Sequence, residues 1–199
     1  MTPIEVRPAR AEDKNAVVAF CQNTFSWGDY IPEVYDTWLA DARGTLLVAL
    51  IDHQPVGLLH AEFLDRGVAW LSGMRVHPDF RRQGVGSAAD AVARSLGRAR
   101  GCRVARLATN IKNIPAQQIL AKEGYTCIVR FNEWEAKPAR RAFSAARVAK
   151  PDHAPAILDA WRAWATREPN PALLVDRNWR WLELNEARLR DQIDAGEVR

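Results

Sequence analysis

Hydrophobic and polar positions along the first half of the chain predict a strand, two helices and three further strands. The first helix begins at Ala11-Glu12-Asp13 and repeats its apolar residues at helical spacing, and Pro32 opens the second helix. The later strands are apolar runs separated by short polar turns, which is typical of a β-meander. The predicted strands are IEVRPA (4–9), TLLVALI (45–51), PVGLLHAEFL (55–64) and VAWLSGMRV (68–76).

The pattern changes at His77-Pro78-Asp79 and becomes helical from Gly84 until Gly101. Further elements follow: a strand at 102–109, a helix at 114–123 with Pro115 in its first turn, and late strands in TCIVRF (126–131) and EWEAK (133–137). Antiparallel strands followed by a strand–helix–strand crossover predict the α/β class, a mixed α+β sheet flanked by helices.

The last part of the chain echoes the beginning at an offset of 140 residues. VRPARAEDKNAVVAF near the start is matched by ARVAKPDHAPAILDA at 146–160, and a further helix is expected over Trp179–Asp194. We interpret residues 1–140 as one domain, and 141–199 as a partial second copy (strand–helix–helix), truncated or degenerate, or as a helical extension. Chance similarity between two amphipathic units is the alternative.

Composition and charge narrow the class of protein. The 199 residues are 48% hydrophobic and 26% charged, which is near the norm for globular proteins, and no apolar run approaches the roughly 18 residues of a membrane span. The amino terminus lacks an apolar signal core, so we expect a cytoplasmic protein. The net charge of +4 suits an anionic partner, but arginine is spread along the chain, which leaves nucleic-acid binding as a remote alternative.

Three cysteines stand far apart, each among apolar neighbours: Cys21, Cys102 and Cys127. An odd number at such spacing indicates buried free thiols in a reducing compartment. We therefore expect neither a disulfide framework nor a metal site.

The stretch RRQGVGSA (81–88) is a candidate anion-binding loop. Two glycines one residue apart allow a ligand to approach the backbone, and the first N–H groups of the following helix have no intrahelical partner. Hydrogen bonds to a charged group contribute about 1.5–3 kcal/mol each, against about 0.3–1 kcal/mol for the helix dipole, so several backbone donors would dominate. The alternative is an ordinary glycine turn that caps a helix.

Two familiar phosphate-binding motifs do not fit this loop. The run from Gly84 to Ala89 matches G-x-G-x-x-G/A, but it does not follow its strand directly and the region 103–110 holds no acidic residue. A P-loop requires Lys after its second glycine, whereas Gly86 is followed by Ser87. Both the dinucleotide and the nucleotide interpretations are thereby excluded.

A third pattern fits. The stretch MRVHPDFRRQGVGSA (74–88) resembles the acyl-CoA-binding motif of the GNAT family of N-acetyltransferases, in which a strand and x-Pro lead to R/Q-x-x-G-x-G/A and a helix. That family's second signature, N-x-x-A-x-x-L-Y-E-K-x-G-F/Y, is similar to NIPAQQILAKEGY (113–125). The resemblance covers residues 4–137. It implies the GNAT fold, a mostly antiparallel sheet splayed between its fourth and fifth strands and flanked by helices, here with a largely helical C-terminal extension.

The resemblance implies an acyl-CoA-dependent N-acyltransferase, in which a primary amine attacks acetyl-CoA directly without a covalent enzyme intermediate. The expected partners are acetyl-CoA, as co-substrate, and a small amine or peptide amine, with no metal and no membrane. The implied cofactor-binding residues are Met74, Val76, Arg81, Arg82, Gln83, Gly84, Val85, Gly86, Ser87 and Asn113. The alternative role of Asn113 is to cap the helix that follows it.

The catalytic residues are less clearly marked. Most amines are protonated at pH 7, so a base is needed. Glu62 is the first candidate and His60, on the same face of the same strand, is the second; each has a solvated or cross-strand-paired side chain as its alternative. The backbone amide near Val76 is a candidate for binding the carbonyl oxygen. Leu120 stands where the family has its general-acid tyrosine, so a non-catalytic acyl-CoA-binding or regulatory module is the main alternative function.

Aromatic residues suggest two further roles. The segment between the first two helices is predicted to hold the amine in an aromatic, partly acidic pocket suited to a cation, unless these side chains pack the loop onto the sheet. Its residues are Trp27, Asp29, Tyr30 and Tyr35. The C-terminal tryptophans predict core or interface positions, including a homodimer contact or a contact with the first domain. They are Trp161, Trp164, Trp179 and Trp181.

Overall fold

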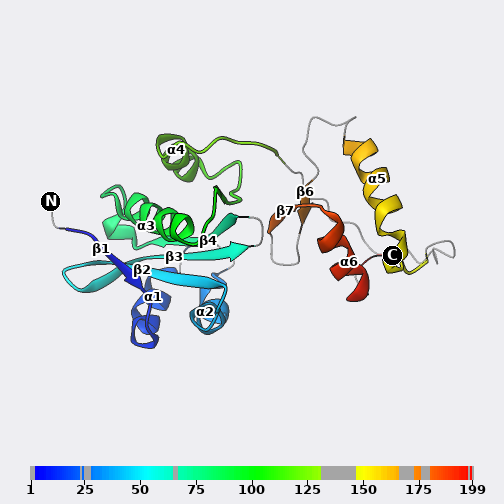
Figure 1. Ribbon diagram of the computed structural model, residues 1–199. Helices are drawn as coiled ribbons and strands as arrows, with labels where there is room; N and C mark the ends of the chain where they lie inside the picture. The colour runs from blue at the N-terminus through cyan, green and yellow to red at the C-terminus, as the bar shows by residue number, and fades with distance from the viewer. Residues whose placement is uncertain are drawn as a thin grey trace. The chain divides into compact units, whose positions relative to one another are not determined.

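A five-stranded sheet in the order β1-β2-β3-β4-β5 organises the first of two compact units, Met1–Tyr125 and Thr126–Arg199 (Figure 1). The computed structural model describes residues 3–22, 24, 28–64, 67–130, 147–165, 173–175, 180–196 and 198. The strands of the first unit are β1 (Glu5–Pro8), β2 (Gly44–Ile51), β3 (Gln54–Leu64), β4 (Val68–Val76) and β5 (Val104–Arg106). Its helices are η1 (Ala11–Asp13), α1 (Lys14–Cys21), α2 (Ile31–Leu39), η2 (Pro78–Phe80), α3 (Val85–Ala99) and α4 (Ile114–Lys122).

The first four strands are antiparallel to their neighbours, which confirms the predicted meander, and β5 is parallel to β4. The β4–β5 pairing is short: it joins Val68–Trp70 to Val104–Arg106. The predicted strand over 102–109 is therefore too long. The chain leaves the sheet after Arg106, and residues 108–115 are exposed on the way into α4. Beyond Trp70 no described strand pairs with this edge of β4.

Helices cover both faces of the sheet, α1 and α2 on one side and α3 on the other (Figure 1). On the first face Val17 of α1 and Tyr35 of α2 pack with Val48 of β2. On the second, Ala89 and Ala93 of α3 pack with the neighbouring strand residue Leu47 and other apolar residues. Successive side chains of a strand point to opposite faces, so a continuously apolar strand such as β2 is the expected result of burial on both sides.

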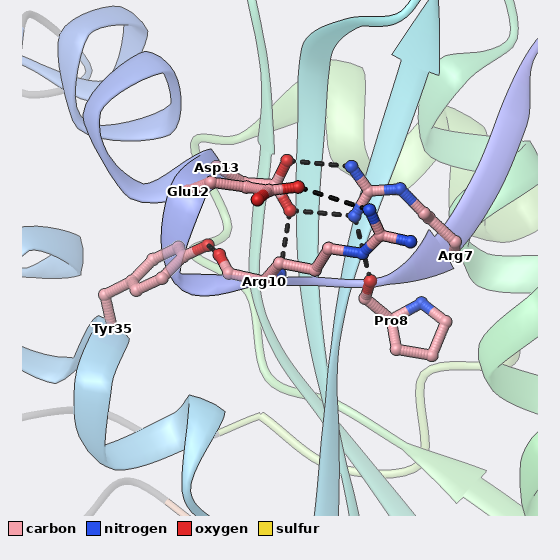
Figure 2. Close-up of polar contacts among 6 residues, drawn as sticks. All are labelled: Arg7, Pro8, Arg10, Glu12, Asp13 and Tyr35. Carbon is pink, nitrogen blue, oxygen red and sulfur yellow. Dashed lines mark hydrogen bonds and ion pairs between the residues drawn. The ribbon is translucent and has the colours of Figure 1, made fainter.

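A polar cluster ties β1 to the 3-10 helix η1 and to α2 (Figure 2). The Arg7 guanidinium donates two hydrogen bonds to the Asp13 carboxylate, at 2.8 and 2.9 Å. The backbone N–H of Arg10 also donates to Asp13, at 2.7 Å, and the Tyr35 hydroxyl donates to the Arg10 carbonyl oxygen at 2.8 Å. Asp13 is buried, and these donors compensate its charge.

The second unit contains η3 (Pro151–His153), α5 (Ala154–Ala165), a two-stranded sheet of β6 (Leu173–Val175) and β7 (Trp181–Glu183), and α6 (Glu186–Asp194). The predicted helix over Trp179–Asp194 is wrong in its first part. Trp181–Glu183 pair antiparallel with β6, and α6 begins only after Asn185, whose side chain caps it by accepting from the Arg188 N–H at 3.0 Å. Trp179 lies outside the described residues.

The predicted strand TCIVRF is not formed over its described residues 126–130. Apolar β-branched composition favours a strand only where a neighbour supplies the ladder hydrogen bonds, and none of the described strands pairs with this segment. The segment EWEAK lies outside the described residues.

The start of the second unit matches the start of the first at the offset of 140. The 3-10 turn Pro151–His153 corresponds to Ala11–Asp13, and the Lys150 N–H donates to His153 Nδ1 at 3.2 Å as the Arg10 N–H donates to Asp13. The Ala149 N–H donates to the carbonyl oxygen of Val198 at 3.2 Å and the Ala9 N–H to that of Leu46 at 2.7 Å, so the donors correspond at this offset and the acceptors do not. The domain boundary at 140/141 and the partial repeat stay a prediction.

All three cysteines are free, but only Cys21 is buried; Cys102 is half-buried and Cys127 is exposed. The expectation of three buried thiols was wrong for Cys102 and for Cys127, and Cys127 lies in the segment that forms no strand. Burial raises the pKa of the Cys21 thiol to about 12, so it is protonated at neutral pH. In the described part of the chain, no helix has both the length and the apolar character that crossing a membrane requires.

Candidate active site

Strand β4 carries a bulge at Gly73. Leu58 of β3 lies opposite Arg75, whereas His60 lies opposite Ser72, so β4 holds one residue more than β3 between these pairs. Gly73 has φ +67°, a conformation that favours glycine. Bulges bend a strand and redirect its edge. The bulge therefore lies between the residues of β4 that pair with β5, Val68–Trp70, and its last residues, which pair only with β3 among the described strands.

The last residues of β4 present backbone groups along an open edge. The His77 N–H donates to Val56 on the β3 side, at 2.8 Å. Because backbone groups alternate between the two edges of a strand, the N–H and C=O of Val76 point away from β3, toward the side where β5 pairs only as far as Trp70. Arg81 Nε lies 3.5 Å from the Val76 carbonyl oxygen at this edge. An extended ligand could pair with β4 here, as peptides add a strand to a sheet.

The glycine loop adjoins that edge. Arg82 and Gly84 adopt left-handed backbone conformations, with φ +61° and +89°, and α3 begins directly afterwards. The side chain of Gln83 donates to the Asp79 carbonyl oxygen at 3.1 Å and so braces the loop. No side-chain hydrogen bond caps the amino end of α3, and Arg81 and Arg82 are exposed.

The loop and the strand edge fit one ligand that has an anionic group and an extended arm. A Cβ on Gly86 would lie 3.8 Å from Met74 Sδ and 4.0 Å from Val76 Cγ2, so the first turn of α3 lies directly beside the end of β4. Val85 and Gly86 are buried and Ser87 is half-buried. A single ligand could thus bind its phosphate at the backbone amides of the amino end of α3 and place an extended arm along β4. Acetyl-CoA has both of these parts.

Asn113 caps α4, as the alternative interpretation predicted. Its Oδ1 accepts from the Ala116 N–H at 3.3 Å, and the residue is exposed. The cap uses one of the side-chain groups and leaves the amide N–H₂ able to donate elsewhere. A cofactor contact of Asn113 stays a prediction.

Tyr125 anchors the segment after α4 to α3. Its hydroxyl donates to Asp90 at 2.7 Å, and Asp90 also accepts from Arg94 at 2.7 Å. Burial, together with the hydrogen bond to Asp90, raises the pKa of Tyr125 above its ordinary value. Tyr125 thus packs against α3, and its hydroxyl is engaged by Asp90.

The candidate bases Glu62 and His60 lie in β3 and are buried on the α2 side of the sheet. The Glu62 carboxylate lies 3.2 Å from the guanidinium of Arg43. His60 Nε2 lies 3.6 Å from the Asp41 carboxylate, and its ring stacks on Trp38 with centroids 4.5 Å apart and planes 6° apart. These partners could not be predicted from the sequence, because nothing local indicates that α2 and the turn after it reach β3.

The register of β3 and β4 places the two candidate bases at different distances from the open end of β4. His60 is opposite Ser72, two residues before Met74, whereas Glu62 is opposite Trp70, four residues before it. At about 3.3 Å per residue these offsets are about 7 and 13 Å along the strand. His60 is therefore the nearer to the open end of β4.

The predicted cation pocket between α1 and α2 is not formed as expected. Tyr35 is completely buried and its hydroxyl is used by Arg10. The Asp29 carboxylate is paired with Arg75 of β4 and does not present a free negative charge. Tyr30 is half-buried, with its ring centroid 5.0 Å from Arg75 Cζ. Trp27 lies outside the described residues.

A mixed sheet with a fifth strand that pairs only at one end, next to a glycine loop and a helix amino terminus, defines an α/β fold of the N-acetyltransferase class. The chain belongs to the Acetyltransferase (GNAT) family, whose sequence profile matches residues 13–125. No curated protein matches the sequence.

Solved structures share the fold at low sequence identity. A transcriptional regulator from Bacillus halodurans C-125 is 21% identical with a TM-score of 0.60, covering 67% of this chain and 100% of the regulator. An aminoglycoside 6'-N-acetyltransferase, AAC(6')-IG from Acinetobacter haemolyticus, is 19% identical with a TM-score of 0.57, covering 68% and 99%. AAC(6')-Iy, in complex with the bisubstrate analogue CoA-S-monomethyl-acetylneamine, is 18% identical with a TM-score of 0.59, covering 69% and 100%.

Proposed function

We propose that this protein is an acyl-CoA-dependent N-acyltransferase that moves an acetyl group from acetyl-CoA to a primary amine. In this reaction the amine nitrogen attacks the thioester carbonyl carbon, the C–S bond breaks, and a proton leaves the nitrogen for a base. The observation that carries the proposal is the contact of the first turn of α3 with the open end of β4, which joins an anion site to a strand edge.

The residues around this contact have distinct roles in the proposal. The amides of residues 83–87 bind the pyrophosphate, and the exposed Arg81 and Arg82 add charge-assisted hydrogen bonds. The edge from Met74 to Val76 pairs with the pantetheine arm, and the Val76 N–H stabilises the charge that develops on the carbonyl oxygen. A CoA derivative bound to AAC(6')-Iy, which has the same fold, supports this choice of ligand.

For the base, the register supports His60 ahead of Glu62, because His60 is closer to the end of β4, whereas the Glu62 carboxylate lies farther along β3 and is paired with Arg43. Replacing the base should lower kcat by about 10²–10⁴-fold. We therefore expect His60→Gln to lose turnover and Glu62→Gln to keep it within about threefold. The reverse result would assign the base to Glu62.

Two measurements test the function. Acetyl-CoA at 100 times its Kd should stabilise the folded protein by about 2.7 kcal/mol, which raises the melting temperature by several degrees. Release of CoA thiol is then followed over a panel of acceptors that includes an aminoglycoside, a polyamine, an amino acid and a peptide amine. Absence of a shift with both acetyl-CoA and CoA would contradict the proposal.

A second function is favoured by one specific feature. Leu120 stands at the position of the family's general-acid tyrosine, and the hydroxyl of Tyr125 donates its hydrogen bond to Asp90. The protein would then be an acyl-CoA-binding or regulatory module without turnover. A thiol with a pKa near about 8.5 is a tolerable leaving group without an acid, which is why we place the enzyme first. A thermal shift without thiol release from any acceptor would favour the module.

A further inference from the structure

A buried ion pair joins the beginning of α2 to the strand that carries the open edge. Arg75 Nε lies 2.7 Å from Asp29 Oδ2, and its second nitrogen donates to Oδ1 at 3.1 Å. The side chain of Asp29 is 1% exposed and that of Arg75 is 10% exposed. Asp29 also accepts from the Ile31 N–H at 3.0 Å, so the same carboxylate starts the helix and binds the strand.

The pair continues into the environment of the candidate base. The ring of Tyr30 lies below the Arg75 guanidinium and packs edge-on against Trp38, with centroids 6.1 Å apart. Trp38 in turn stacks on His60. One continuous row of contacts therefore runs from the last residues of β4, across α2, to the imidazole on β3.

The position of Arg75 on β4 decides which face this row occupies. Met74 and Val76, on either side of it, point toward α3, as their contacts with Gly86 require. Arg75 points to the opposite face, because strand side chains alternate. In the proposed function the glycine loop holds acetyl-CoA from the α3 side, which leaves the α2 side of the strand to the amine; on that side Tyr30 is half-buried, whereas Asp29 is buried beneath the surface.

Stability alone does not account for an ion pair in this place. Taking two charges out of water costs several kcal/mol per ion, and replacing such pairs by apolar residues is often neutral or stabilising. What the bidentate pair adds is a fixed geometry, since two parallel N–H···O bonds restrict both distance and orientation.

We propose that Arg75 is a positioning residue for the acceptor amine: through Asp29 it holds the first turn of α2 and Tyr30 at a fixed distance from the end of β4. This inference rests on the proposed acyltransfer function. It assigns Arg75 an effect on amine binding and no contact with the reacting atoms.

The test compares two bidentate pairs in the same unit. Arg75→Lys keeps the positive charge but loses the two parallel hydrogen bonds of the guanidinium group. The double variant Asp29→Asn/Arg75→Gln removes both charges together. The matched control is Arg7→Lys, which makes the same change in the Arg7–Asp13 pair on β1, an edge strand separated from β4 by β2 and β3 (Figure 2). For each variant that keeps the wild-type thermal shift with acetyl-CoA, the KM for the amine, kcat and the Kd for CoA are measured.

We expect both changes at Arg75 to raise the amine KM by about tenfold, with kcat and the CoA Kd within about threefold of wild type. Arg7→Lys should lower the melting temperature without changing the amine KM. An unchanged amine KM in both Arg75 variants, with active wild type, overturns this inference alone. If wild type releases no CoA thiol with any acceptor, the proposed function fails and this inference fails with it.

Discussion

The ring of Trp38 occupies the space that a side chain on Gly73 would need. A Cβ at Gly73 would lie 2.5 Å from Trp38 Cζ3 and 2.7 Å from Cη2, a distance that real side chains do not tolerate. The absence of a side chain at the bulge of β4 is therefore what allows α2 to pack closely enough for Trp38 to stack on His60.

Gly73→Ala should lower the free energy of unfolding by about 3 kcal/mol or more, because it combines a left-handed backbone with a clash against an aromatic ring. Urea unfolding measures the loss. The matched control is Gly101→Ala, since Gly101 has φ +80° and nothing within 4 Å of its Cβ position. It should cost only about 1 kcal/mol. Equal losses in the two variants would contradict the packing role of Trp38.

The two glycines of the loop should respond differently to alanine. Gly84 has φ +89°, so Gly84→Ala strains the turn and shifts the amides that follow it. Gly86 is inside α3, where a methyl group meets only ordinary contacts, and alanine gains up to about 1 kcal/mol of helix propensity. We expect Gly84→Ala to weaken acetyl-CoA binding at least about tenfold, and Gly86→Ala to keep binding and stability. Isothermal titration calorimetry and thermal unfolding check both; loss of binding in Gly86→Ala alone would contradict the loop geometry.

Two buried carboxylates make the stability depend on acidic pH. Burial acts to raise the pKa of Asp13, but its hydrogen bonds with Arg7 and the Arg10 N–H outweigh this and hold the pKa below its ordinary range. Asp29 has a lowered pKa in the same way: burial is opposed by the hydrogen bond from Arg75. Both folded-state values thus lie below the unfolded value of about 3.9. Their stabilisation is complete above about pH 5 and is lost as the pH falls through the folded values.

The free energy of unfolding, measured in urea between pH 7 and 3, should therefore decline below about pH 5. Asp13→Asn should lower the value at pH 7 by about 1.5–3 kcal/mol and make the decline shallower. Tyr35→Phe is the control: it removes the hydrogen bond to Arg10 and costs about 1 kcal/mol, without removing an acidic group. A decline that is equally steep in Asp13→Asn would contradict the role of this carboxylate.

Tyr125→Phe should reduce stability and spare catalysis. It breaks the hydrogen bond to Asp90, which anchors the segment after α4 to α3, at a cost of about 1.5–3 kcal/mol for a bond to a charged group. If acyltransfer needs no acid from this residue, kcat should stay within about threefold of wild type. A loss of about 10²-fold or more, with acetyl-CoA binding intact, would identify Tyr125 as the general acid.

Most strands and helices of the first unit were predictable because the signals that specify them are local. The apolar run around Val48, the proline in the first turn of α4 and the cap at Asn113 depend on residues within a few positions. The glycine loop was found from equally local residues, and its role as an anion site stays a prediction. The second unit was less predictable. Trp181 lies in strand β7, which pairs with β6, and not in the predicted helix. A short run of apolar residues is compatible with a helix or a strand, and only a partner strand decides between them.

By itself, then, the sequence determined the order of the elements from β1 to α4 and the two motifs of the family. The tertiary structure decided the rest of the site. Arg75 is 46 positions from Asp29, and Trp38 fills the space beside a glycine on a different element. Such contacts depend on strand register, on a bulge of one residue and on where a helix crosses the sheet. Periodicity along the chain contains no information about these distances, because they are set only when separate elements pack together.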